Sequence, residues 1–142
     1  MSAGERPTPP PTPFRSVGAF HTAFGLPVRD RPTADIPAPE AALRQALLDE
    51  EVDELRAAVA AGDVVAIADA LADIVYIACG TAHAYGIDLD AVVAEVHRSN
   101  MTKLGGDGRP LYREDGKVLK GPGYEPPRLE AVLGLQQDGA DA

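Results

Sequence analysis

The sequence predicts an all-α protein, an up-and-down bundle of helices that assembles as a homo-oligomer. Long stretches are rich in Ala, Leu and Glu, which favour helix, and each stretch ends at a glycine. The third helical stretch, residues 63–85, is apolar on nearly every side, so it belongs in the middle of an assembly. One chain of 142 residues hardly surrounds such a helix, and we therefore expect a homodimer or a dimer of dimers.

The first half of the chain is expected to form two helices separated by a loop. Residues 14–25 carry Phe and Val at helical spacing and end at a glycine. Prolines recur through residues 26–39, which predicts a loop. Residues 40–61 then read as one long helix, and Gly62 marks its end.

The second half is expected to contain two more long helices and a less regular segment. Asp63 can cap the helix over residues 63–85, and Asp88 can cap a fourth helix that runs to about Lys103. Asp-Gly pairs beyond it predict turns and short extended pieces. A last short helix is expected over residues 127–133.

A chain of this length fits a single domain, which we place at residues 14–134. Residues 1–13 are rich in proline and cannot bury apolar surface, so we expect them to be disordered. Residues 135–142 are expected to form a flexible tail.

The composition argues against several classes of protein. The chain has 13 Lys and Arg residues and 22 Asp and Glu residues, a net charge of −9, which argues against nucleic-acid binding. Cys79 is the only cysteine, so an internal disulfide and a cysteine-based zinc site are excluded. No signal peptide is evident, and the most apolar stretch is interrupted by acids and too short to span a bilayer comfortably. We therefore expect a cytoplasmic protein without a membrane partner.

One run of the long second helix reads DEEVDE and is almost entirely acidic. On a helix that turns about 100° per residue, Glu51 and Glu54 fall inside the apolar arc and Glu50 lies at its edge. Asp49 and Asp53 fall outside the arc and are interpreted as ordinary surface acids. The carboxylates on the apolar face need a partner, because burying an unpaired charge costs many kcal/mol.

The next helix carries acids that can complete a site. Asp69 and Asp73 lie one turn apart in a narrow polar stripe and can project to the same point. Arg44 is the only basic residue on the acidic helix's apolar arc, and it lies more than one turn away. A divalent cation is therefore the better partner, and carboxylates without His or Cys favour Mg²⁺, for which Mn²⁺ can substitute. Ordinary helix-end acids and ion pairs between helices are the alternative. The candidate metal ligands are Glu50, Glu51, Glu54, Asp69 and Asp73.

Several segments together carry a resemblance to a known family. The pattern Glu-Glu-x-x-Glu at residues 50–54 is followed on the next helix by Asp73 in DALADIVY. Three further segments accompany it: FHTAFGLP (20–27), HRSNMTK (97–103) and REDGKVLKGPGYEPP (113–127). This combination resembles the all-α NTP pyrophosphatases, and most of all their MazG-like, dimeric dUTPase-like branch. The resemblance covers roughly residues 14–133.

The resemblance implies Mg²⁺-dependent hydrolysis of a nucleoside triphosphate, with dUTP the first to test, to the monophosphate and pyrophosphate. It also implies that a glutamate, Glu50 or Glu51, orients the attacking water. The family pattern on the second helix is Glu-x-x-Asp, whereas this chain has Ala70 at the first position. We interpret Asp69, one residue earlier, as the substitute. The metal ligands implied by the resemblance are Glu50, Glu51, Glu54 and Asp73.

An acidic chain also needs groups that bind the substrate's phosphates. Asn100 and Lys103 lie on about one face of the fourth helix, and the resemblance implies that they bind phosphate, with assistance from Lys120. His21, beside Phe20, is a candidate for lining a pocket for the base. The simpler alternatives are exposed surface lysines and a packed histidine.

Two other functions stay open from the sequence alone. Phosphoribosyl-ATP pyrophosphohydrolase belongs to the same superfamily, but the tail after Lys103 is more elaborate than that activity needs. A metal-free helical interaction module is the non-enzymatic alternative. Because a ligand that binds only the folded state raises its stability, a melting temperature unchanged by Mg²⁺ or Mn²⁺ would favour the module.

Overall fold

The computed structural model describes residue 4 and residues 11–135 of the chain. The chain divides into two compact units, Met1–Ile87 and Asp88–Ala142, and each is described by itself. The expected disorder of the proline-rich start concerns mainly residues outside the described ones, and most of the expected flexible tail, residues 136–142, also lies outside them.

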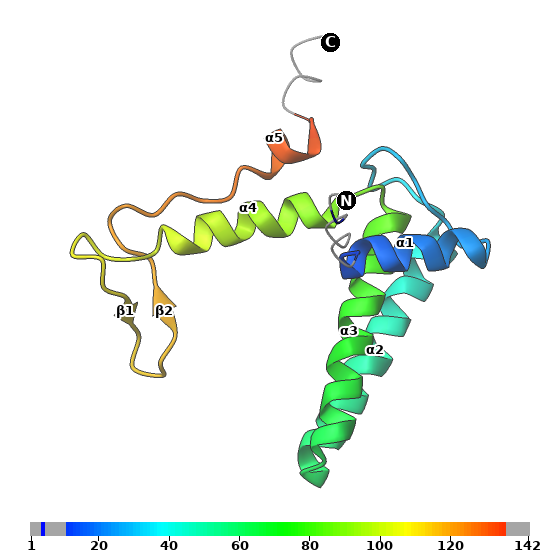
Figure 1. Cartoon of the computed structure of the whole chain (residues 1–142), viewed down its shortest axis with the longest axis horizontal. Coiled ribbons are helices and arrows are strands. Elements are labelled where there is room, and N and C mark those ends of the chain that lie inside the picture. Colours follow the sequence, from blue (N-terminus) through cyan, green and yellow to red (C-terminus); the bar gives the residue numbers. More distant parts are fainter. Residues whose placement is uncertain (1–3, 5–10, 136–142) are drawn as a thin grey trace. The chain divides into compact units, whose positions relative to one another are not determined.

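The first unit contains three helices, α1 (Pro13–Ala23), α2 (Ala38–Ala61) and α3 (Val64–Ala84). Helices α2 and α3 lie side by side along their length, and α1 packs on α3 (Figure 1). All three expected helices are confirmed, with ends shifted by at most two residues from those predicted. The described part of the chain is mostly helical, in agreement with the all-α prediction.

A tight turn joins α2 to α3 and makes them antiparallel. Gly62 adopts the left-handed conformation, with φ at +66°, which ends α2 at little steric cost. The Asp63 side chain then accepts hydrogen bonds from the backbone N–H groups of Val65 and Ala66, both at 3.1 Å. These bonds satisfy two N–H groups that have no partner within the helix. The glycine stop and the aspartate cap are both confirmed.

The core where the three helices meet is built around a glycine. Gly80 of α3 is buried, and the Arg44 guanidinium of α2 and the His21 ring of α1 lie against it. A side chain at this position would collide with both groups, so the glycine permits the close approach. Val17 of α1 is also fully buried in this unit.

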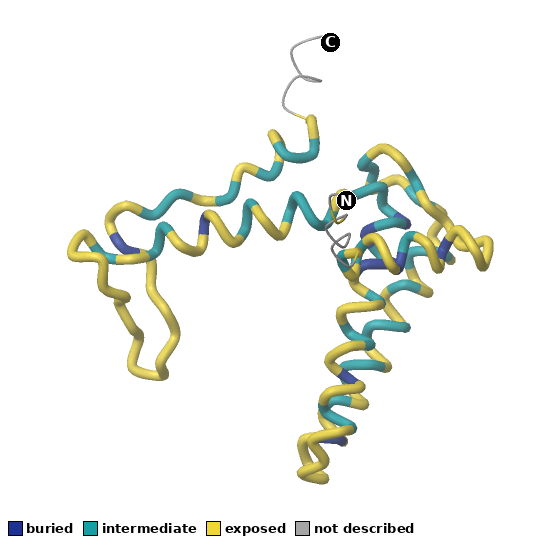
Figure 2. Tube along the Cα trace, in the orientation of Figure 1, coloured by how far each residue is buried: buried dark blue, intermediate teal, exposed yellow. Residues whose placement is uncertain are grey.

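The most apolar helix, α3, is poorly covered within its own unit. Its 21 residues are long and apolar enough to cross a membrane by length and composition, so the expectation that this stretch is too short was wrong. Large side chains on it, among them Leu71 and Val75, are exposed, and Figure 2 shows exposed residues along the α2–α3 hairpin. An uncovered apolar face of this kind suits burial against a second copy, and the homo-oligomer stays a prediction.

The second unit contains α4 (Leu89–Met101), the strands β1 (Leu111–Tyr112) and β2 (Val118–Leu119), and α5 (Leu129–Leu133). The strands pair antiparallel, with Leu111 opposite Leu119 and Tyr112 opposite Val118. The hairpin turn contains the Asp-Gly pair at Gly116, which confirms the predicted turn and extended pieces. Helix α4 packs against α5 within this unit. Whether α4 joins the helices of the first unit in one bundle stays a prediction.

Candidate metal centre

Three carboxylates from the two antiparallel helices of the first unit converge. Glu51 and Glu54 lie one turn apart on α2, and Asp73 faces them from α3. Each offers one carboxylate oxygen, and these three oxygens all lie within 4.8 Å of one another. The tight turn between the helices brings these residues together. The two glutamates on α2 and Asp73 on α3 lie at similar distances along the chain from this turn.

The cluster has no counter-charge from the described residues. Glu51 is half-buried, and its Oε2 atom is buried without a hydrogen-bond partner. None of the described ion pairs involves Glu51, Glu54 or Asp73. Burial raises the pKa of Glu51, and contact with Glu54 and the negative charges of Asp73 and Asp69 raise it further. Such a carboxyl favours either a bound proton or a bound cation.

Arg44, the one basic residue on the apolar arc of α2, does not neutralise this cluster. Its Nη2 group donates to the carbonyl of Ile77 at 3.0 Å, and its Nε group donates to Thr81 Oγ1 at 3.1 Å. Burial lowers the pKa of this guanidinium. A groove of about 280 Å³ runs beside it between α2 and α3, but the groove does not include the acids. The groove is lined by Ala41, Arg44, Gln45, Leu48, Ala78, Thr81 and Tyr85.

The other two candidate ligands lie outside the group of three. Glu50 and Asp69 are both exposed, although the charge of Asp69 is close enough to raise the pKa of Glu51. Ala70, which stands at the family's glutamate position, is buried and offers no ligand atom. The roles of Glu50 and Asp69 as ligands therefore stay predictions.

The two acids interpreted as surface residues lie at the surface. Asp49 is exposed and accepts a hydrogen bond from Gln45, and Asp53 is exposed and pairs with Arg56 at 2.8 Å. Both acids are therefore engaged with neighbours on their own helix. Helical phase alone separated these two acids from Glu51, but the expectation that Glu54 also lies on the buried face was wrong, because Glu54 is exposed.

The candidate phosphate-binding residues all lie in the second unit. Asn100 is exposed on the last turn of α4, and Lys103 is half-buried just beyond it. The Gly121 N–H donates to the Lys103 carbonyl at 2.9 Å, so Lys120 and Lys103 occupy adjoining backbone segments. The Lys120 ammonium lies over the Tyr124 ring, 4.7 Å from its centroid. The structure thus brings two candidate lysines together by their backbone.

His21, the candidate for a base pocket, is buried with only 3% of its surface exposed. Its Nδ1 group lies 2.9 Å from the Pro27 carbonyl and donates a hydrogen bond to it. This arrangement fits the alternative of a packed histidine. The more accessible aromatic surface is formed by Phe20 with Phe24 and Tyr76, whose ring centroids lie 4.4 and 5.6 Å from that of Phe20.

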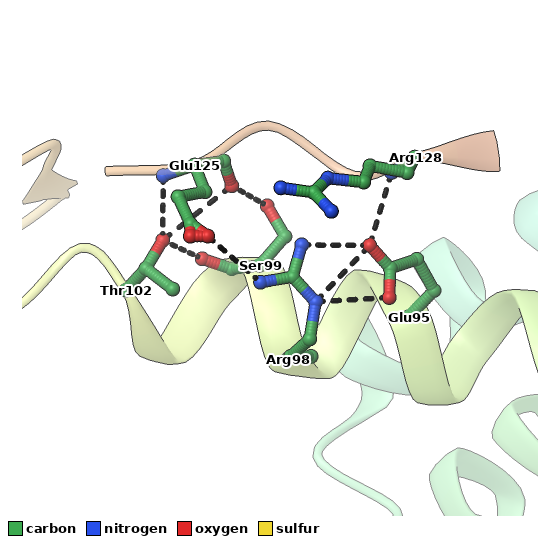
Figure 3. Close-up of polar contacts among 6 residues, drawn as sticks. All are labelled: Glu95, Arg98, Ser99, Thr102, Glu125 and Arg128. Carbon is green, nitrogen blue, oxygen red and sulfur yellow. Dashed lines mark hydrogen bonds and ion pairs between the residues drawn. The ribbon is translucent and has the colours of Figure 1, made fainter. Parts of the chain in front are cut away.

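Sequence reasoning missed a set of polar residues that ties α4 to the segment before α5. Ser99 and Thr102 of the SNMT segment bond to the backbone of Glu125 (Figure 3). Their spacing of three residues places both side chains on one face of the helix, and this spacing was the only hint in the sequence that they act together. Side chains that bond a distant backbone leave no periodic pattern, so the partner segment could not be identified.

Comparison with known proteins gives similarities of three kinds. A family model for phosphoribosyl-ATP pyrophosphohydrolase matches residues 17–100. An uncharacterized protein of Acanthamoeba polyphaga mimivirus is 31% identical over 112 residues, which make up 77% of this chain and 42% of the viral protein. The chain thus spans less than half the length of that relative.

The third similarity is to a crystal structure from Exiguobacterium sp. 255-15, provisionally described as an NTP pyrophosphohydrolase. The match covers 93% of this chain and 99% of the other, at 27% identity and a TM-score of 0.49. A TM-score below 0.5 does not establish a common fold, so the family model is the strongest of the three similarities.

Proposed function

The chain belongs to the phosphoribosyl-ATP pyrophosphohydrolase family, and from that premise we propose that it is a metal-dependent nucleotide pyrophosphohydrolase. The observation that supports this proposal is the cluster of Glu51, Glu54 and Asp73, with oxygens within 4.8 Å of one another. The buried Oε2 of Glu51 has no hydrogen-bond partner, and a divalent cation would satisfy it. Glu54 itself is exposed, so the support comes from the half-buried Glu51 and Asp73 and from the unpartnered oxygen of Glu51.

The three carboxylates would hold Mg²⁺ or Mn²⁺, and Glu50 and Asp69 are further candidate ligands. When bound, the metal neutralises charge on substrate phosphates and lowers the pKa of water at the site. The chain's own part is to keep the carboxylates side by side and to take a proton from the attacking water. The resemblance gives that second role to Glu50 or Glu51, and of these two only Glu51 is half-buried and belongs to the converging group.

We propose a nucleoside triphosphate as the substrate and its monophosphate plus pyrophosphate as the products, with dUTP as the first compound to test. Segments such as FHTAFGLP, which resemble the dimeric dUTPase-like branch, favour dUTP. Asn100, Lys103 and Lys120 would bind the phosphates, and an aromatic surface around Phe20 is available for the base. Phosphoribosyl-ATP is the competing substrate, because the matching family model carries that name.

The first experiment is a substrate panel. Purified protein with Mg²⁺ is incubated with dUTP, the other dNTPs, the NTPs and phosphoribosyl-ATP, and products are separated by anion-exchange chromatography. The proposal predicts a monophosphate and pyrophosphate from at least one nucleoside triphosphate. Cleavage of phosphoribosyl-ATP alone would support the competing substrate. No cleavage of any compound would contradict the proposed function.

Matched acid variants test whether the cluster carries the reaction. Glu51→Gln and Glu54→Gln should abolish turnover, because each removes a charged oxygen from the converging group. Asp49→Asn and Asp53→Asn remove the same charge from exposed positions on the same helix and should have mild effects. Equal losses in both pairs would show that general acidity, and not the cluster, sets the activity.

We also propose that the protein works as a cytoplasmic homodimer or a dimer of dimers. The exposed apolar side chains of α3 support a second copy as the partner of this helix. Asp69 and Asp73 argue against a membrane environment for the same helix, because carboxylates are costly in a bilayer interior. Sedimentation equilibrium tests the proposal, and a monomer at micromolar concentration would contradict it.

A further inference from the structure

We infer that the groove beside Arg44, between α2 and α3, binds a small organic carboxylate with a compact apolar body. The groove does not include Glu51, Glu54 or Asp73, and the inference does not rest on the proposed function. It assigns a ligand to a half-buried arginine that the candidate metal centre does not use.

The Arg44 guanidinium is fixed in place and has one nitrogen left for a ligand. Its Nε group donates to Thr81 Oγ1 at 3.1 Å, and its Nη2 group donates to the Ile77 carbonyl at 3.0 Å. Among the described residues nothing accepts a hydrogen bond from Nη1, and this atom is not one of the buried polar atoms that lack a partner. Nη1 is therefore accessible, and a guanidinium that is already ordered loses little freedom when it binds an anion.

The charges around Arg44 leave one positive charge without a counter-charge. Glu40 pairs with Arg29 at 2.8 Å and its charge also acts on Arg44, so one carboxylate serves two guanidinium groups. None of the described ion pairs involves Arg44, and burial lowers the pKa of its guanidinium. A half-buried cation of this kind gains from a charge-assisted hydrogen bond to an anion. A single positive charge is best matched by a monoanion.

The walls of the groove determine the rest of the ligand. Ala41 and Leu48 of α2 and Ala78 of α3 supply apolar surface, and Tyr85 also lines the groove. In the part of the chain that the structure describes, the Tyr85 hydroxyl makes no hydrogen bond, so it is a second donor for the anion. The groove has a volume of about 280 Å³, whereas a cavity of about 150 Å³ already holds benzene. One ring or a short alkyl chain beside a carboxylate therefore fits.

A polyphosphate suits this groove poorly. Arg44 and Glu51 are seven residues apart on α2, a separation of about 10 Å along the helix and only about 20° around it. The converging carboxylates thus lie two turns away on nearly the same side of the helix. Their negative charge, in a chain of net charge −9, repels a ligand with several charges more strongly than it repels a monoanion. The groove and the nucleotide site therefore take different ligands.

The test uses the full chain and benzoate as the probe, titrated in amide NMR spectra with a chelator present, so that no metal at the acids binds the probe. Benzoate should shift amide resonances of residues 41–48 and 78–85. Benzamide has nearly the same shape without the charge and should bind at least about tenfold more weakly. Equal binding of benzamide, shifts confined to other residues, or no shifts at millimolar benzoate would overturn the inference.

Two variants separate the charge from the space. Arg44→Met removes the guanidinium and should weaken benzoate binding by at least about tenfold. Because this variant also loses the bonds to α3, Ala78→Leu tests the groove with Arg44 in place, and its larger side chain should weaken binding to a similar extent. Ala46→Leu is the matched control, because Ala46 is exposed on α2 outside the groove, and binding should stay unchanged. Equal effects of the two leucine variants would overturn the assignment of the groove.

A second copy of the chain is the competing occupant, because α3 exposes Leu71 and Val75. Sedimentation equilibrium of the wild type, Ala78→Leu and Ala46→Leu distinguishes the two occupants. A groove that takes a small carboxylate predicts the same mass for all three proteins, with and without benzoate. A lower mass for Ala78→Leu alone, together with a wild type that benzoate does not shift, would show that a second copy fills the groove and would overturn the inference. Nucleotide cleavage is measured separately, so failure of the proposed enzyme leaves this test intact.

Discussion

Replacing Gly80 with alanine should strongly destabilise the first unit, because this glycine lies where side chains of the three helices meet. A Cβ atom at this position would lie 2.5 Å from Arg44 Nη2 and 2.7 Å from His21 Nε2. Both distances are far below van der Waals contact, so both groups would have to move. Neither is free to do so without loss, because Arg44 is bonded to Ile77 and Thr81 and His21 is bonded to Pro27.

The expected loss combines three effects of different sign. Overpacking a core by one methyl group costs about 1–3 kcal/mol. Displacing a charged group from one hydrogen bond costs about 1.5–3 kcal/mol. Alanine regains about 1 kcal/mol over glycine in a helix. We therefore expect Gly80→Ala to lower the free energy of unfolding by about 3 kcal/mol, which corresponds to about 10 °C in melting temperature for a chain of this size.

Urea unfolding followed by circular dichroism measures this loss. Gly123→Ala is the control, because nothing lies within 4 Å of a Cβ at that glycine and its backbone needs no left-handed conformation. It should change stability by less than about 0.5 kcal/mol. A second test combines Gly80→Ala with Arg44→Met, which removes the guanidinium that the new methyl group would meet. The loss of unfolding free energy in the double variant should then be smaller than the sum of the two single losses by about 1 kcal/mol or more. A loss below about 0.5 kcal/mol in Gly80→Ala, or full additivity, would refute the reasoning.

The helix cap, the acid cluster and the ion pair on α4 each give a further prediction. Asp63→Ala removes the acceptor of two backbone N–H groups and should cost about 1 kcal/mol in urea unfolding, whereas a loss near zero would contradict the capping role. In the absence of metal, the pKa of Glu51 is raised in the folded state, so the contribution of Glu51 to stability falls as the pH rises from 4.5 through that folded-state pKa. Glu51→Gln should remove this slope from the curve of stability against pH. Glu95 acts in the opposite sense: hydrogen bonds from Arg98 lower its pKa to about 2, so its stabilisation is lost as the pH falls from 4.5 to about 2. Glu95→Gln should flatten that part of the acid-unfolding curve, and an unchanged curve would show that the ion pair contributes nothing.

The helices of the first unit could be predicted from the sequence because their signals are local. Gly62 and Asp63 stop one helix and start the next by bonds that reach only a few residues along the chain. Helical phase also carried enough information to separate Glu51 from Asp53. Two positions along a helix differ by about 200°, so the two side chains point to nearly opposite sides. These features depend on geometry that every α-helix shares.

The composition of the acid cluster could be predicted only in part. Glu50 and Glu51 are adjacent on the helix, and at the edge of an apolar arc a difference of one position decides between a half-buried and an exposed carboxylate. Asp69 lies one turn from Asp73, yet it is exposed outside the group of three. Phase gives the direction of a side chain from the helix axis, but the tilt of the facing helix decides which side chains meet.

The attachment of the second unit's tail could not be predicted from the sequence. Ser99 and Thr102 were visible as polar residues at the end of a helix, but their partner at Glu125 is more than twenty residues away. A bond from a side chain to a distant backbone group has no preferred sequence spacing. The same limit applies to Gly121, whose need for glycine arises from a carbonyl of another segment.

The short link between α2 and α3 makes the hairpin intolerant of changes in length. Each additional residue would shift one helix by about 1.5 Å and turn it by about 100° relative to the other. Glu54 would then no longer oppose Asp73, although neither residue had been touched. An insertion or deletion at Gly62 or Asp63 would therefore act like a mutation of the acids themselves.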